Sequence, residues 1–182
     1  IPACTGLTAP GVFTLPPGGI SRAAARHATD ASVVGPANPA QVGEIISVYL
    51  TGLGQVSPPV ATGAPGPSNP LSWAAHDIQV FVDGVPAPPP QFVGLTPTVV
   101  GLGVINVQIP AGVRVGQEVP LYVQGPDSYT AQATVSIKAS TGTAAVSILA
   151  GNNQNATINT AFAARLIVQV KDAAGKPVSG AF

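Results

Sequence analysis

Hydrophobic residues recur at every second position in five segments of the chain, residues 44–51, 77–84, 104–110, 118–125 and 132–138. In each segment one set of alternate positions is aliphatic, while the other set is mostly polar or aromatic. Since side chains on a β-strand point alternately to its two faces, this period predicts five half-buried strands. The aliphatic set is expected to face a core and comprises Ile46, Val48, Leu50, Ile78, Val80, Val82, Ile105, Val107, Ile109, Val119, Leu121, Val123, Ala133, Val135 and Ile137.

Residues that form turns bound these segments, as strands joined by tight connections require. Asp83-Gly84 predicts a hairpin turn, because both residue types tolerate a positive φ. Pro120 predicts an edge position for its strand, because proline cannot donate to a sheet ladder. Residues 56–72 carry five prolines and predict a long, extended loop within the first domain. That loop is either a binding surface or a stiff crossover between two sheets.

A second unit, residues 145–182, follows a small and polar segment, residues 139–144, that predicts a linker. The sequence of this unit predicts a strand, a polar turn, a long strand and, after the turn DAAGKP, the start of a further strand. Two or three strands cannot hide both faces of a sheet, so the unit is expected to be truncated or to be completed by another chain. The candidate residues for an intersubunit strand are the alternate hydrophobic positions Leu166, Val168 and Val170.

The composition favours an all-β fold, since 24 Val and 11 Ile stand against only 10 Leu and 2 Glu. Charged residues make up 8% of the chain, and the net charge is zero. This balance gives no electrostatic attraction for nucleic acid or anionic lipid, and prolines interrupt the long uncharged stretches. We therefore expect no nucleic-acid partner and no membrane insertion. A surface with so little charge favours an extracellular location and close lateral association.

Residues suited to catalysis or metal binding are sparse. His27 and His76 are the only histidines, and both are expected at the surface or in loops, because no Gly-x-Ser-x-Gly nucleophile turn accompanies them. The chain cannot readily supply the three or four close ligands that zinc needs. Its Gly-x-Gly segments lack the third glycine of a dinucleotide site. We therefore expect no enzymatic activity, no metal and no cofactor.

Two single residues each have two interpretations. Cys4, the only cysteine, is either a small buried apolar residue or half of an intermolecular disulfide. Trp73, the only tryptophan, either closes one end of the core or presents an exposed ring to a sugar or a protein partner. The candidate residues for contact with a ligand or partner are Trp73, Tyr49, Tyr122, Pro58 and Pro59.

Five stretches of the chain resemble the Solibacter-type uncharacterised C-terminal domain, a module of large secreted or surface proteins. They are APGVFT (9–14), PANPAQVGEIISVYLTGLGQVSPPVATGAP (36–65), VFVDGVPAPP (80–89), FVGLTP (92–97) and GVINVQIPAGVRVGQEVPLYVQG (103–125). The resemblance covers about residues 9–138 and implies an immunoglobulin-like β-sandwich akin to the IPT class, with no catalytic residues to transfer. Residues 151–181 are similar to the opening strands of group 1 bacterial immunoglobulin-like domains, the invasin and intimin type, which implies an incomplete second unit.

We therefore expect an all-β protein, with an immunoglobulin-like β-sandwich over residues 1–138 and a partial second immunoglobulin-like domain over residues 145–182. The first functional hypothesis is a non-catalytic structural or adhesion segment of a secreted or cell-surface bacterial protein. Strand complementation would assemble it into filaments, with other copies of itself or neighbouring domains of the same protein as partners. The alternative is an accessory carbohydrate-binding module of a secreted enzyme, with polysaccharide as its partner.

Overall fold

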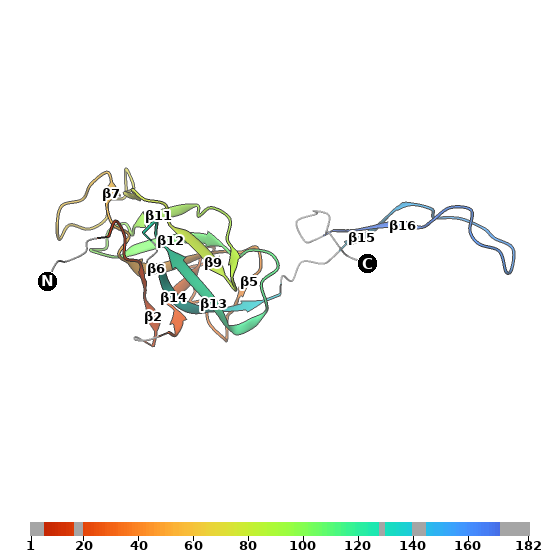
Figure 1. Cartoon of the computed structure of the whole chain (residues 1–182), viewed down its shortest axis with the longest axis horizontal. Helices are drawn as coiled ribbons and strands as arrows, with labels where there is room; N and C mark the ends of the chain where they lie inside the picture. The colour runs from red at the N-terminus through yellow and green to blue at the C-terminus, as the bar shows by residue number, and fades with distance from the viewer. Residues whose placement is uncertain (1–5, 17–19, 128–129, 140–144, 172–182) are drawn as a thin grey trace. The chain divides into compact units, whose positions relative to one another are not determined.

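A computed structural model describes residues 6–16, 20–127, 130–139 and 145–171 of the chain (Figure 1). These residues form strands and connecting loops without any helix, so the predicted all-β class is confirmed. They therefore contain no helix long and apolar enough to cross a membrane. The chain divides into two compact units, Ile1–Ala139 and Ser140–Phe182.

The first unit contains two seven-stranded sheets. In the first sheet every pairing is antiparallel, and β6 and β12 lie at its centre. Its strands, in spatial order, are β1 (Gly11–Val12), β6 (Ile45–Thr51), β12 (Gly103–Gln108), β11 (Phe92–Leu95), β8 (Trp73–Ala74) and β7 (Val56–Ser57), with β4 (Ala25–His27) also paired to β6.

The second sheet is mixed. Its strand β14 runs parallel to two short strands near the N-terminus and antiparallel to β13. In spatial order the sheet contains β10 (Val85–Pro86), β9 (Gln79–Val82), β13 (Gly116–Gln124), β14 (Thr130–Lys138), β3 (Arg22–Ala23) and β2 (Thr14–Leu15), with β5 (Ala40–Gln41) also paired to β14.

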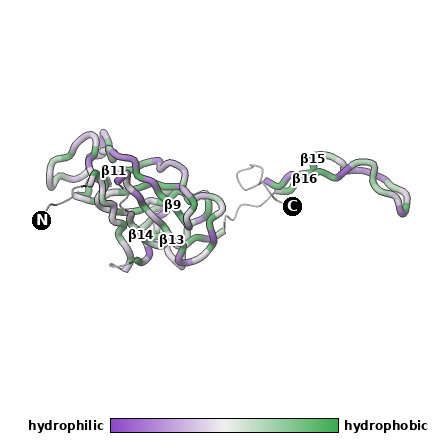
Figure 2. Tube along the Cα trace, in the orientation of Figure 1, coloured by the Kyte–Doolittle hydropathy of each residue, from purple (hydrophilic) through white to green (hydrophobic). Residues whose placement is uncertain are grey.

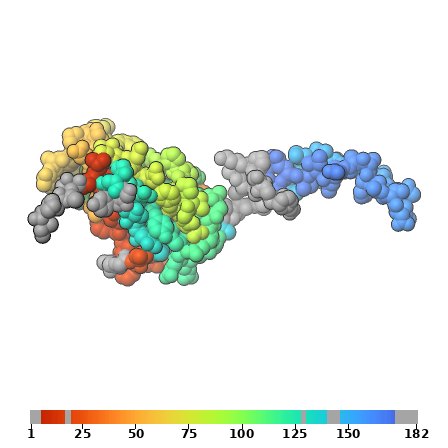
Figure 3. Space-filling view, in the orientation of Figure 1, coloured from red at the N-terminus to blue at the C-terminus, as the bar shows by residue number. Residues whose placement is uncertain are grey.

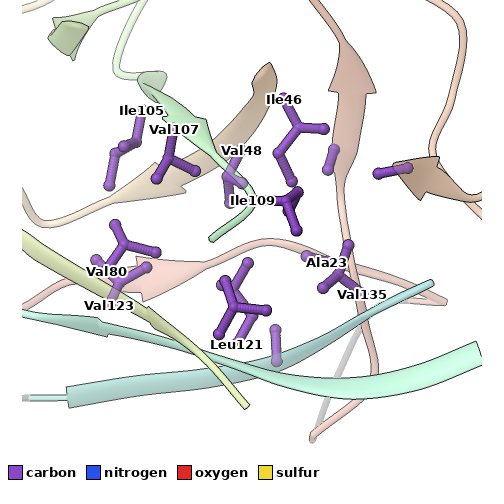
Figure 4. Packing of buried hydrophobic residues seen from close by; sticks show 14 of the residues in the cluster. Ala23, Ile46, Val48, Val80, Ile105, Val107, Ile109, Leu121, Val123 and Val135 are labelled. Carbon is purple, nitrogen blue, oxygen red and sulfur yellow. The ribbon is translucent and has the colours of Figure 1, made fainter. Parts of the chain in front are cut away.

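The two sheets face each other across a single core. The alternating pattern assigned fifteen side chains to the core, and all fifteen are buried. Figure 4 shows side chains of the first sheet, such as Val48 and Val107, facing Leu121 and Val123 of the second sheet. Hydrophobic and hydrophilic residues interleave along the tube of this unit in Figure 2. Burial of such a Val, Leu or Ile side chain stabilises a fold by about 1.5–3 kcal/mol, so the interface between the sheets is the main source of stability.

The predicted hairpin turn is confirmed, and the predicted edge strand is wrong. Val82 pairs with Val85 across Asp83 and Gly84, and both turn residues have a positive φ, of 53° and 76°. Strand β13, which contains Pro120, lies inside its sheet, between β9 and β14. Pro120 is tolerated there because its nitrogen and its carbonyl both point to the side where β9 has already ended. The carbonyl accepts a hydrogen bond from the N–H of Asp83, in the turn after β9 (2.8 Å).

The proline-rich segment 56–72 starts and ends in the same sheet. Its first residues form β7, which pairs with β8 immediately after the segment. The segment itself therefore stays in the first sheet, and the connection from β6 to β9 crosses to the second sheet only after β8. Backbone hydrogen bonds between Gly66 and the loop at 98–99 hold the middle of the segment (2.8 and 3.1 Å).

The second unit contains one antiparallel pair, β15 (Ala145–Ala150) and β16 (Ile167–Lys171), as the alternation predicted. Leu166 lies just before β16, whereas Val168 and Val170 lie within it. The described residues of this unit form a narrow two-stranded ribbon (Figure 3). Three predictions fall outside the described residues: all of the predicted linker 139–144 except Ala139, the strand expected after Lys171, and Cys4.

Candidate functional site

Trp73 lies on the outer face of the first sheet, where β8 joins β11. Its side chain is 46% exposed, and its ring meets the ring of Phe92 in an edge-to-face arrangement, with centroids 4.7 Å apart and planes at 73°. Phe92 is only 8% exposed, yet it is not part of the core between the sheets. Trp73 therefore does not close one end of the core, and the first of its two interpretations is wrong.

Strand register aligns Trp73 with Tyr49 across the first sheet. Trp73 pairs with Gly94, Gly94 pairs with Val104, and Val104 pairs with Tyr49. Paired residues on adjacent strands point to the same face, so these positions form one row on the outer face. Val104 is 7% exposed and, like Phe92, lies outside the core. The outer face thus has an apolar layer of its own.

Gly94 allows the aromatic rings to approach the backbone of this row. A Cβ atom at position 94 would overlap the carbonyl oxygen of Ser72 and lie 2.7 Å from Cζ of Phe92. Any other residue would therefore push either β8 or the Phe92 ring away. The close contact between β8, β11 and the two rings depends on this glycine.

Sequence reasoning missed three further residues of this outer face. Phe13 is 45% exposed and donates its backbone N–H to the carbonyl of Tyr49 (3.0 Å), which extends the row by one strand. Asn106 is the register partner of both Phe92 and Ser47. The Ser47 hydroxyl donates to Oδ1 of Asn106 (2.8 Å), and this bond fixes the orientation of the amide.

The predicted contact residues do not form one site. Tyr49 and Trp73 share the row on the first sheet, but Tyr122 lies on β13 of the second sheet, where its hydroxyl meets Nε2 of Gln132 (3.4 Å). Pro58 and Pro59 are exposed at the start of the loop after β7, and the carbonyl of Pro58 accepts a hydrogen bond from the Ser72 hydroxyl (2.8 Å). The structure thus brings together only part of the predicted set.

The prediction that His27 lies at the surface is wrong. This residue is 6% exposed on β4, because that strand pairs with β6 over its whole length. Its Nδ1 bonds the Glu44 carboxylate, and its Nε2 bonds the carbonyl of Asn38 (3.2 Å). A carboxylate and a backbone carbonyl only accept hydrogen bonds, so this geometry suits the doubly protonated imidazolium, in which both ring nitrogens donate. Neither ring nitrogen is free to activate a nucleophile.

The environment of His27 stabilises its charged form. Burial alone would lower its pKa, but the hydrogen bonds to Glu44 and Asn38 and the nearby carboxylates of Glu44 and Asp30 outweigh burial and raise the pKa above the ordinary value of 6.5. The second oxygen of Glu44 accepts the backbone N–H of Gln41 (2.8 Å). This arrangement fixes the turn before β6 and has a structural role.

A metal centre and a cavity are two other kinds of site. Within the described ranges, no group of three His, Cys, Asp or Glu side chains could hold a metal ion. A cavity of about 410 Å³ beside β2 and β3 is lined by residues that include Leu15, Ile20, Arg22 and Glu118. Nε of Arg22 is buried without a hydrogen-bond partner among the described residues. The cavity contains none of the predicted contact residues.

Comparisons with known proteins do not assign this chain to a family. No protein-family model matches the sequence, no curated protein matches it, and no solved structure matches it. The resemblance to the two bacterial surface modules, and with it the immunoglobulin-like character of the fold, therefore stays a prediction.

Proposed function

We propose that this chain is a non-catalytic structural or adhesion segment of a secreted or cell-surface bacterial protein, and that it assembles by strand complementation at β15 and β16. The observation that carries the proposal is the exposed apolar surface of this hairpin. Val146 is 65% exposed, Ile148 54% and Val168 48%. The partner strand comes from a second copy or from a neighbouring domain of the same protein.

One face of the hairpin supports this proposal directly. Val146 pairs with Val170, and Ile148 pairs with Val168, so four β-branched side chains share that face. Two strands alone cannot bury such a face and are only marginally stable. Covering each of these side chains would stabilise the unit by about 1.5–3 kcal/mol, which favours a complex over the isolated hairpin.

The edges of the strands also favour pairing in the second unit over pairing in the first. In the first unit, β1, β2, β7 and β10 are each two residues long, and each contains a proline or lies next to one. Short edges with proline resist the addition of a further strand. Strands β15 and β16 are six and five residues long without proline, and their outer edges pair with no other strand in the described part of the chain.

The charge of the chain agrees with a role in assembly outside the cell. Only 8% of its residues are charged, and the net charge is zero, so neighbouring copies repel one another weakly. The resemblance to surface modules points the same way.

Size-exclusion chromatography with light scattering on the full chain tests this proposal. We expect a mass above that of the monomer, and we expect Val168→Lys to return the chain to a monomer, because a buried lysine on the apolar face is costly. Ile20→Lys is the matched control, since Ile20 is 66% exposed in the first unit. A wild-type monomer at every concentration, with amides of 145–171 protected from hydrogen exchange, would contradict the proposal.

A further inference from the structure

We infer that the outer face of the first sheet is a binding site for an uncharged polysaccharide, centred on Trp73, Phe92 and Asn106. This site lies in the first unit, whereas the proposed assembly uses β15 and β16 of the second. The inference therefore goes beyond the proposed function and can fail separately from it.

The apolar part of the site is a pair of rings on a rigid support. Trp73 is 46% exposed above Phe92, which is 8% exposed, and neither residue belongs to the core. The row from Trp73 to Tyr49 crosses four strands spaced about 4.8 Å apart, so it extends for about 14 Å. Gly94 and Val104 in the middle of the row are buried, so a ligand would contact its two ends, Trp73 and Tyr49, and this separation suits an oligosaccharide segment better than a single sugar.

Asn106 supplies the polar part. Its register partner is Phe92, so its amide lies on the same face beside the ring. Because Oδ1 accepts the Ser47 hydroxyl (2.8 Å), Nδ2 is the group left to donate, and it has no partner among the described residues. A sugar hydroxyl is a suitable acceptor. A hydrogen-bond donor next to an aromatic ring is the combination that orients a ligand in a mostly apolar site.

The strands that carry the row, β6, β12, β11 and β8, have no charged side chains, which favours an uncharged ligand. An anionic polysaccharide would lose hydration along this row, and Arg26, the register partner of Ser47 on β4, already donates its Nη1 to the carbonyl of Ala31 (3.3 Å). A peptide is also disfavoured as an added strand, because these strands lie inside the sheet and already pair on both sides. The face therefore fits a neutral glycan.

The site is already formed without a ligand. Gly94 holds the Phe92 ring against the backbone, and paired strands fix the register of every residue in the row. Binding then orders few side chains, which reduces its entropic cost.

Native gel electrophoresis of the full chain, in gels that contain barley β-glucan, xylan or galactomannan, tests the inference, with polygalacturonate as the anionic comparison. We expect retardation in at least one neutral gel. Trp73→Ala and Asn106→Ala should each weaken it by about tenfold or more. Tyr122→Ala, on the opposite sheet, is the matched control and should change nothing. Trp73 is the only tryptophan, so its fluorescence should shift when oligosaccharides of the retained polymer are added.

Two further variants separate binding from folding and from assembly. Trp73→Tyr keeps a ring and should retain measurable binding, whereas a general loss of structure would abolish binding in both variants. Val168→Lys changes only the second unit and should leave retardation unchanged. The inference is overturned by the absence of retardation in every neutral gel, by retardation in polygalacturonate alone, or by equal retardation of Trp73→Ala and wild type. Selective retention on a proline-rich peptide column, lost in Trp73→Ala, would assign the face to a polypeptide and overturn it as well.

Discussion

The hydrogen bonds of His27 determine which charge state of its imidazole is stabilised in the folded chain. The protonated ring can donate from both nitrogens, one to the Glu44 carboxylate and one to the carbonyl of Asn38, which suits these two partners. The pKa of His27 is accordingly higher in the folded chain than the ordinary 6.5. A raised pKa gives stability that is complete below about pH 6.5 and is lost as the pH rises through the folded value.

We therefore predict that the free energy of unfolding decreases as the pH rises above 6.5. Urea unfolding between pH 6 and pH 9 measures this slope. His27→Gln should abolish most of the slope, because glutamine does not titrate. His76→Gln is the matched control and should keep it. Equal slopes in wild type and His27→Gln would show that the ring carries no charge in the folded chain.

At the scale of elements, hydrogen bonds between Thr8 and Asp127 attach the segment before β1 to the turn after β13. Thr8 is 2% exposed, and the Asp127 carboxylate accepts both its hydroxyl (2.7 Å) and its backbone N–H (3.1 Å). The Thr8 hydroxyl is the main reason that the pKa of Asp127 is lowered. Gly125 makes room for this cluster, because a Cβ atom there would overlap the Thr8 hydroxyl.

Gly125→Ala should therefore displace Thr8 and lower the free energy of unfolding by about 2–4 kcal/mol, as a buried clash with lost hydrogen bonds does. Gly116→Ala, at the start of β13, is the matched control, since its Cβ would lie in ordinary contact, 3.8 Å from Val119. It should change the stability by less than about 0.5 kcal/mol. Denaturant unfolding measures the stability of both variants. Equal losses of stability would show that the clash between residue 125 and Thr8 is not the cause.

The elements predicted from sequence are the ones long enough to show a period. Strands β6, β9, β12, β13 and β14 have four to nine residues, and their alternation identified every inward side chain correctly. Strands of two or three residues, such as β3 and β4, show no period. Their core residues Ala23 and Ala25 are small, and the other buried residue of these two strands, His27, is polar. Their positions depend on pairing with distant strands, which no local pattern records.

At the scale of the whole molecule, the candidate site was only partly predictable, because it is a product of strand order. Tyr49 and Trp73 lie in one row only because β12 and β11 fit between their strands. The same strand order separates Tyr122 from them, although its own strand looked equivalent in sequence. The sequence identified these aromatic residues, but the face that each one joins follows from the sheet topology.

The two units should also differ in how their stability depends on concentration. The first unit has a closed core, so its central amides in β6, β12, β13 and β14 should exchange slowly at any protein concentration. Amides of β15 and β16 should exchange quickly when the chain is dilute and become protected as it is concentrated, because association stabilises only the bound form. Hydrogen exchange with mass spectrometry across a dilution series measures both sets, and Val168→Lys should remove the change in β15 and β16 alone. Protection of β15 and β16 that persisted in the most dilute sample would show that the hairpin is stable without a partner strand, which would contradict the assembly.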